Sequence, residues 1–141
     1  MARIKIDFPE PVVFSTRIPV RITDINYGGH LGNDALLSLI HEVRMQFLRH
    51  YGYSEKDMGG VSVIMGDCAI VYKAEAYHGD VLHAELSVSD VNKYGFDVFY
   101  RFSNETTGKE VAVAKTGIVC FDYASRKVAS LPERLAFLPS S

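Results

Sequence analysis

The first clear pattern along the chain is an alternation of apolar and polar residues from Val13 to Ile22. A period of two places the apolar side chains on one side of an extended backbone, which is typical of a half-buried β-strand. Pro19 lies within this pattern and has no backbone N–H to donate. We therefore expect the strand to lie at an edge of its sheet or to be irregular at that point.

A helical period replaces the alternation after a polar, glycine-rich loop at Thr23–Gly32. In the next segment, apolar residues recur at spacings of three and four: Leu36, Leu39, Ile40, Val43 and Phe47. This spacing predicts one long amphipathic helix. The helix would begin with Asn33 as its N-cap and run to about Tyr51, because Gly52 favours termination. The apolar arc is broad, so we expect the helix to be substantially enclosed.

Strand patterns dominate the rest of the chain. They cover four segments: Val61–Ala74, Asp80–Asn92, Phe96–Asn104 and Glu110–Asp122. The last two connections are short and contain glycine, as β-hairpins require. Val128–Ser130 can add a short edge strand, and Ser54–Asp57 resembles a capping box that favours a short helical turn. One strand, one long helix and four further strands predict an α+β domain whose helix packs on an antiparallel sheet.

One predicted strand has more apolar surface than a single helix can cover. Residues Val61–Val71 are apolar on both faces of their strand. Large apolar patches on a soluble protein usually mark a contact with another molecule. We therefore expect a homodimer that pairs its sheets edge to edge.

Length and composition limit the possible classes of protein. The 141 residues suit a single domain, and 48% hydrophobic residues suffice for a core. The formal net charge is −2 and no basic run occurs, which argues against a nucleic acid partner. No apolar N-terminal segment or membrane-length apolar run is present, so we expect no signal peptide, no membrane contact and a cytoplasmic location. Cys68 and Cys120 lack a metal-binding spacing, so we expect two buried thiols, no disulfide and no metal site.

The loop and the helix carry a recognisable spacing of residues: Asp24, Gly29, His30, Asn33, Glu42 and Arg44. In this spacing the chain resembles the hotdog-fold acyl-CoA thioesterases that include 4-hydroxybenzoyl-CoA thioesterase, which typically carry D-x-D-x-x-G-H-x-N-N and then E-x-R. The segments AEAYHGDVLHAELSV and CFDYASRKVASLPERL are similar to later parts of that family. The chain departs from the pattern at three positions, where the family has an acid, an asparagine and an aromatic residue: Asn26, Gly32 and Leu36.

The resemblance implies a hotdog fold over residues 1–141, in which a five- to six-stranded antiparallel sheet wraps one long central helix. It also implies an enzyme that hydrolyses an acyl-CoA thioester to a free acid and coenzyme A without a cofactor. This enzyme would be a homodimer or homotetramer with its active site between subunits. Asp24 stands at the position of the family's catalytic carboxylate, as a general base or nucleophile.

Thioester hydrolysis also needs hydrogen-bond donors for the oxyanion that develops on the carbonyl. The free N–H groups and positive dipole end of the helix N-terminus can polarise that carbonyl. We predict that five residues of this region bind substrate: Tyr27, Gly28, Gly29, His30 and Asn33. Glu42 on the helix is the second choice for the catalytic carboxylate, although an ion pair on the polar side of the helix suits it as well.

Each of these roles has a structural alternative. Asp24 can bond to its own turn, His30 can pack against the helix start, and Asn33 can cap the helix. Three other functions also stay open: hydrolysis of an acyl-carrier-protein thioester, hydration of an enoyl thioester, and acyl-thioester binding without catalysis. The sequence leaves open the acyl group and the choice between dimer and tetramer.

Overall fold

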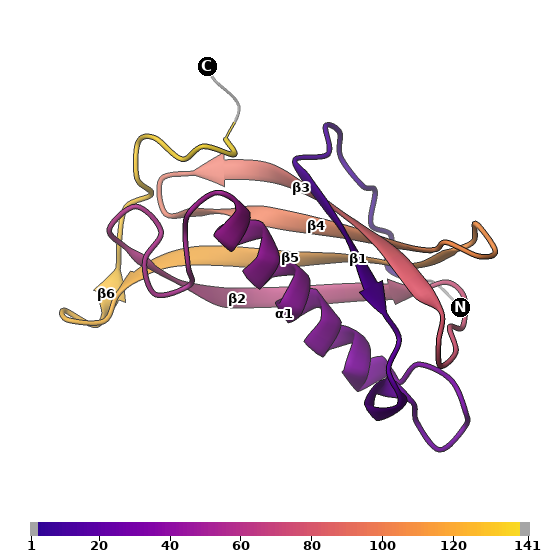
Figure 1. Ribbon diagram of the computed structural model, residues 1–141. Helices are drawn as coiled ribbons and strands as arrows, with labels where there is room; N and C mark the ends of the chain where they lie inside the picture. The colour runs from indigo at the N-terminus through magenta and orange to yellow at the C-terminus, as the bar shows by residue number, and fades with distance from the viewer. Residues whose placement is uncertain (1–2, 139–141) are drawn as a thin grey trace.

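The computed structural model describes residues 3–138 as one α-helix packed on a six-stranded antiparallel sheet, which confirms the predicted α+β class (Figure 1). In chain order the elements are β1 (Phe14–Pro19), the 3-10 helix η1 (Ile22–Asp24), α1 (Asn33–His50), β2 (Ser62–Tyr72), β3 (Val81–Asn92), β4 (Gly95–Asn104), β5 (Glu110–Asp122) and β6 (Lys127–Val128). The long strands lie close to their predicted bounds, and β5 matches them at both ends.

The strands follow the order β1-β3-β4-β5-β2, and β6 pairs with β5. Strand β1 is therefore at one edge, where Pro19 opposes Val81, and the predicted edge position is confirmed. Strand β2 forms the other edge. Its register with β5 shifts between Met65 and Asp67, which marks a bulge at Gly66. Within the described chain, one side of the β2 backbone thus has no strand beside it.

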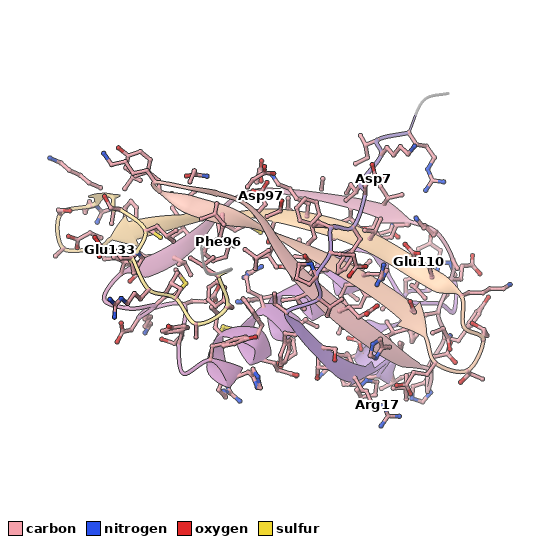
Figure 2. All side chains as sticks on the ribbon, turned by 90° about the horizontal axis from the view of Figure 1, so that it is seen from above. Asp7, Arg17, Phe96, Asp97, Glu110 and Glu133 are labelled. Carbon is pink, nitrogen blue, oxygen red and sulfur yellow. The ribbon has the colours of Figure 1, made fainter. Side chains whose placement is uncertain are left out.

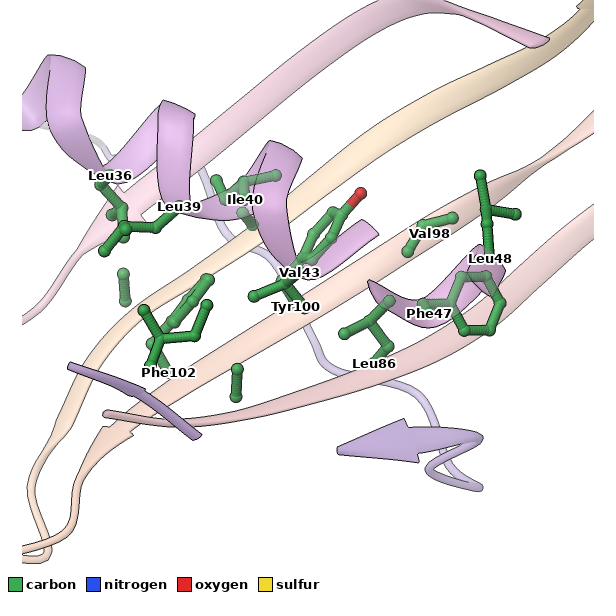
Figure 3. Close-up of a cluster of buried hydrophobic side chains, with 14 of the residues drawn as sticks. Leu36, Leu39, Ile40, Val43, Phe47, Leu48, Leu86, Val98, Tyr100 and Phe102 are labelled. Carbon is green, nitrogen blue, oxygen red and sulfur yellow. The ribbon is translucent and has the colours of Figure 1, made fainter. Parts of the chain in front are cut away.

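Helix α1 lies across one face of the sheet and buries its apolar stripe there (Figure 1). Figure 3 shows the resulting cluster: Leu36, Leu39, Ile40, Val43, Phe47 and Leu48 from the helix, with Leu86, Val98, Tyr100 and Phe102 from the strands. Each large side chain buried in this way contributes about 1.5–3 kcal/mol. The opposite helix face stays open, because a single chain supplies one sheet to cover one face. Leu37 is 42% exposed, so the prediction of a substantially enclosed helix is wrong for the isolated chain.

Arg44 places a charge inside this apolar layer. Its guanidinium donates to the Tyr100 hydroxyl and to the Glu55 carboxylate, each at 3.2 Å. Tyr100 in turn shares a 2.8 Å hydrogen bond with Thr116 on β5. Burial by itself lowers the pKa of Arg44, but Tyr100 and Glu55 outweigh it, and the pKa lies above its ordinary value. The side chain therefore stays charged, and its hydrogen bonds offset the cost of burying that charge.

Local structure differs from the sequence-based predictions at three places. The N-cap of α1 is Gly32, and Asn33 is the first helical residue. The segment Ser54–Asp57 forms no helical turn, because the Glu55 carbonyl accepts a hydrogen bond from Val63 and ties the segment to β2. The short edge strand is Lys127–Val128 rather than Val128–Ser130.

The two cysteines lie in different surroundings. Both are free thiols, and Cys120 is buried as predicted. Cys68 is exposed, so the prediction of a buried thiol is wrong at this position. It lies on the edge strand β2, which pairs with β5 on one side and, within the described residues, has no strand on the other. Among residues 3–138, no helix is both long enough and apolar enough to cross a membrane.

The Arg44 network yields a test of stability. We expect Tyr100→Phe to lower the free energy of unfolding by about 1–3 kcal/mol, because the buried guanidinium loses an acceptor. Urea denaturation monitored by circular dichroism measures this change. Tyr94→Phe is the matched control, since Tyr94 is 46% exposed, and it should stay within about 0.5 kcal/mol of the wild type. Equal effects of the two substitutions would contradict the role given to the network.

Candidate active site

The loop between η1 and α1 is folded by its own side chains. The amide oxygen of Asn26 accepts hydrogen bonds from the backbone N–H groups of Gly28 at 2.9 Å and His30 at 3.4 Å. Gly29 has a φ of +86°, a conformation that glycine adopts without a steric cost. Asn26, at the position where the family that the chain resembles has a second acid, therefore shapes the loop.

Asp24 is buried at the base of this loop, with 5% of its surface exposed. Its Oδ2 accepts a 2.8 Å hydrogen bond from the backbone N–H of Arg21, and the Arg21 guanidinium lies 3.3–3.4 Å from both carboxylate oxygens. The Asp24 carbonyl accepts from Gly32 N–H at 3.0 Å. Asp24 thus joins the two ends of the loop, and both carboxylate oxygens already have partners.

A pocket of about 300 Å³ lies between the first turn of α1 and the segment that follows β2. We call it the helix-start pocket. Its apolar lining consists of Leu31, Leu36, Ala74, Ala76 and Val111. Its polar lining consists of His30, Asn33, Tyr72, Lys73 and Glu75, together with the backbone of Gly32. An apolar cavity with a few convergent polar groups is the usual form of a small-molecule site.

The start of α1 brings uncapped backbone donors to this pocket. The N-cap residue Gly32 has no side chain and makes no side-chain cap. The first N–H groups of a helix have no carbonyl partner within the helix, and the helix dipole places partial positive charge there. The Tyr72 hydroxyl donates to the Asn33 carbonyl at 3.0 Å and so fixes β2 against the helix start. Burial raises the pKa of Tyr72, which keeps this hydroxyl protonated.

His30 and Glu75 meet at the mouth of the helix-start pocket. His30 Nδ1 lies 3.2 Å from the Leu31 carbonyl, and His30 Nε2 lies 3.6 Å from Glu75 Oε1. The backbone N–H of Leu31 donates to Ala76 at 2.7 Å, next to both residues. Figure 1 shows the loop beside the connection from β2 to β3. The Tyr77 hydroxyl donates to Glu75 Oε2 at 2.7 Å, and this bond raises the pKa of Tyr77.

The structure gathers two of the predicted substrate-binding residues, His30 and Asn33, in one pocket. Gly28 and Gly29 shape the loop without lining the pocket, and Tyr27 is fully exposed at the loop surface. Glu75 and Tyr72 are residues that the sequence analysis missed. Each is far from the loop and the helix start in the sequence, and the fold of the sheet brings it close to them. The spacing of the motif therefore could not identify these two residues.

Glu42 lies in a different place. It lines a groove of about 340 Å³ between β1 and α1, with Arg17 and Arg21 on the strand side. Arg17 projects outward from β1 (Figure 2), with 68% of its side chain exposed. Glu42 itself is exposed and accepts a 2.7 Å hydrogen bond from Gln46 on the next helical turn. The structure therefore does not bring Glu42 to the pocket that contains the helix start.

The two cysteines and the possible metal-binding side chains of the described chain do not favour a thiol or a metal site. Desolvation raises the pKa of both Cys68 and Cys120, which disfavours the nucleophilic thiolate. Within residues 3–138, no cluster of three or more histidine, cysteine, aspartate or glutamate side chains is arranged to hold a metal ion.

Comparisons with known proteins match most of the chain. A family model described as the thioesterase-like superfamily matches residues 20–136. A 1,4-dihydroxy-2-naphthoyl-CoA hydrolase of Synechococcus elongatus is 30% identical over 120 residues, covering 82% of this chain and 87% of that protein.

Solved structures show the same fold. The 1,4-dihydroxy-2-naphthoyl-CoA thioesterase Slr0204 of Synechocystis has a TM-score of 0.78 at 24% identity, covering 85% of this chain and 90% of that one. SAV2348 of Staphylococcus aureus, solved in complex with CoA, has a TM-score of 0.78 at 17% identity and covers 92% and 82%. Together with the single helix on an antiparallel sheet, these similarities confirm the predicted hotdog fold.

The position of Asp24 yields a prediction about the loop. We expect Asp24→Ala to lower the free energy of unfolding by about 0.5–2 kcal/mol, as loss of a capping side chain does. Asp24→Asn should cost less, because its amide oxygen can still accept from the Arg21 N–H. Urea denaturation of both variants measures the difference. A wild-type stability in Asp24→Ala would show that the side-chain hydrogen bonds of Asp24 to Arg21 do not stabilise the loop.

Proposed function

The chain belongs to the thioesterase-like superfamily and is a thioester hydrolase, and on this premise we propose that it cleaves an acyl-CoA to a free acid and coenzyme A in the helix-start pocket. The carrying observation is the uncapped N-terminus of α1, which borders a largely apolar pocket. The names of the Synechococcus and Synechocystis relatives also support an acyl-CoA substrate. Coenzyme A enters as part of the substrate, and the reaction requires no separate cofactor.

The thioester carbonyl is proposed to sit at the first turn of α1. The backbone N–H of Asn33 and its neighbours would donate to the carbonyl oxygen, where negative charge develops during attack by water. The acyl group would extend over the apolar lining, beside Leu36 and Val111. Aromatic acyl groups are the first to test, because relatives are named for the 1,4-dihydroxy-2-naphthoyl group.

Asp24 as general base or nucleophile stays a prediction. Both of its oxygens lie 3.3–3.4 Å from the Arg21 guanidinium, whose side chain is 65% exposed. Its position outside the lining of the helix-start pocket favours a role in holding the loop instead. Glu42 lines a different groove from the helix-start pocket, so it is a weaker candidate for the catalytic carboxylate.

A homodimer or homotetramer with the active site between subunits is part of the proposal. Three apolar side chains, one on α1 and two on β2, are exposed to a similar extent: Leu37 at 42%, Met65 at 43% and Tyr72 at 39%. Tyr72 also lines the helix-start pocket and ends β2. A second copy paired along β2 would cover this surface and stand next to the pocket.

An enoyl-thioester hydratase is the second candidate function. Hydration needs a positioned acid and base, and the structure brings His30 within 3.6 Å of Glu75. An assay with crotonyl-CoA distinguishes hydration of the enoyl group from hydrolysis of the thioester. Loss of its enoyl absorbance without thiol release would favour the hydratase.

The role of the helix N-terminus can be tested by removing one backbone donor. Proline is favoured at the first position of a helix and lacks an N–H. The φ of −72° and ψ of 150° at Gly32 suit a residue that precedes proline. We expect Asn33→Pro to reduce kcat about 10²–10³-fold in a thiol-release assay with aromatic, short-chain and long-chain acyl-CoAs.

Asn33→Ala is the matched control, since it removes the side chain and keeps the N–H. It should retain most of the wild-type kcat. Equal activities of the proline and alanine variants would contradict donation by the Asn33 amide. A wild-type protein that releases thiol from none of the acyl-CoAs would contradict the proposed function itself.

The contribution of a second copy can be tested at the free edge of β2. We expect Met65→Arg to produce monomers and to lower kcat/KM, because a charge there opposes burial between copies. Val91→Arg is the control, since Val91 is 46% exposed at the far end of β3 and should leave the assembly unchanged. Light scattering coupled to size exclusion measures both masses. A Met65→Arg variant with wild-type mass would rule out β2 as the interface.

A further inference from the structure

We propose that His30 and Glu75 together hold and activate the water that attacks the thioester. This inference rests on the proposed function and assigns the general base of the same pocket. Glu75 is exposed over 58% of its side chain and His30 over 31%, so both remain accessible to water. Both residues line the helix-start pocket, which also contains the first turn of α1.

The hydrogen bond of His30 determines which ring nitrogen can accept a proton. The Leu31 carbonyl accepts at 3.2 Å from Nδ1, so Nδ1 carries the hydrogen in the neutral ring. Nε2 then has a free lone pair, and it lies on the side of Glu75. Two acceptors cannot bond to each other directly. The 3.6 Å between Nε2 and Oε1 instead allows one water, about 2.8 Å from each, to donate to both.

Glu75 is held in place for this role from two sides. Tyr77 donates its hydroxyl to Oε2, the oxygen that does not face His30. The 2.7 Å hydrogen bond from Leu31 N–H to Ala76 fixes the two backbones directly beside the pair. Oε1 thus remains free for the water, while the distance between His30 and Glu75 is set by neighbouring contacts.

The proposed reaction balances with water as the sole co-reactant. The water oxygen bonds to the carbonyl carbon while one water proton moves to His30 Nε2. The carbonyl oxygen becomes an oxyanion that the amides of the first helical turn stabilise, and the Glu75 carboxylate stabilises the imidazolium. When the C–S bond breaks, the leaving thiolate takes the proton from Nε2. The products are a carboxylic acid and a thiol, and the pair returns to its starting state.

The other carboxylates fit this task less well. Both oxygens of Asp24 already interact with Arg21, and Asp24 does not line the pocket. Glu42 lies in the groove beside β1. Glu75 combines a free oxygen, a histidine partner and a place in the helix-start pocket.

The test compares kcat and KM of single and double variants on the best acyl-CoA substrate. We expect Glu75→Gln and His30→Gln each to lower kcat about 10²-fold or more with little change in KM, because each removes part of the base. The double variant should lose hardly more than either single variant, because residues that act as one unit are not additive. Glu75→Asp keeps the charge and should restore part of the lost kcat.

Glu133→Gln, a change at an exposed residue near the C-terminus, is the matched control and should behave as the wild type. Thermal unfolding of every variant separates loss of fold from loss of chemistry. A wild-type kcat in Glu75→Gln, or multiplicative losses in the double variant, would overturn the pair while the proposed function stands. A hundredfold loss of kcat in Asp24→Asn, with wild-type kcat in the Glu75 and His30 variants, would show that Asp24 is the general base instead of the pair. If the wild type itself releases no thiol, the proposed function fails and the pair fails with it.

Discussion

The packing of α1 on the curved sheet is the interaction on which the rest of the structure depends. The helix supplies a large part of the core, and its apolar stripe meets side chains from β3 and β4 (Figure 3). Because this contact fixes the axis of α1, it also fixes where the helix begins. The first turn then lies next to the end of β2, where Tyr72 binds the carbonyl of Asn33. The helix-start pocket is thus a consequence of core packing.

Residues near the helix start divide into those that hold the loop and those that leave space for a ligand. The Asp24 side chain accepts from the backbone N–H of Arg21 just before the loop, and Asn26 accepts from a backbone N–H within the loop. Gly32, at the N-cap, has no side chain to accept a hydrogen bond from the free N–H groups of the helix. A serine or aspartate at that position would occupy the helix amides with its own oxygen. The glycine therefore leaves these donors available to a carbonyl oxygen, which is the requirement of thioester hydrolysis.

One strand, β2, contributes both to the candidate site and to the free edge of the sheet. The same strand carries exposed Met65 and Cys68 and ends at Tyr72 in the pocket. Unpaired strand edges with apolar side chains favour association with another strand. The buried Arg44 network ties the helix to β4 and to β5, the strand with which β2 pairs. Assembly and catalysis are therefore proposed to depend on one strand.

The sequence by itself determined the kind and the bounds of the main elements. Alternation and helical periodicity reflect which side of each element is buried, and this can be read locally. The spacing around Asp24 and His30 also identified the hotdog thioesterase family. The N-cap at Gly32 and the exposure of Cys68 were missed, because they depend on backbone geometry and on which strand lies at an edge.

Only the tertiary structure decided which polar groups meet. Glu75 lies far from His30 along the chain, and the sheet brings the two side chains to 3.6 Å. Asp24, the strongest candidate from the motif, is turned toward Arg21 instead. Local periodicity specifies the face of each element that is buried. The distances between side chains on different elements follow from how the whole sheet curves around α1, and no short segment of the sequence contains that information.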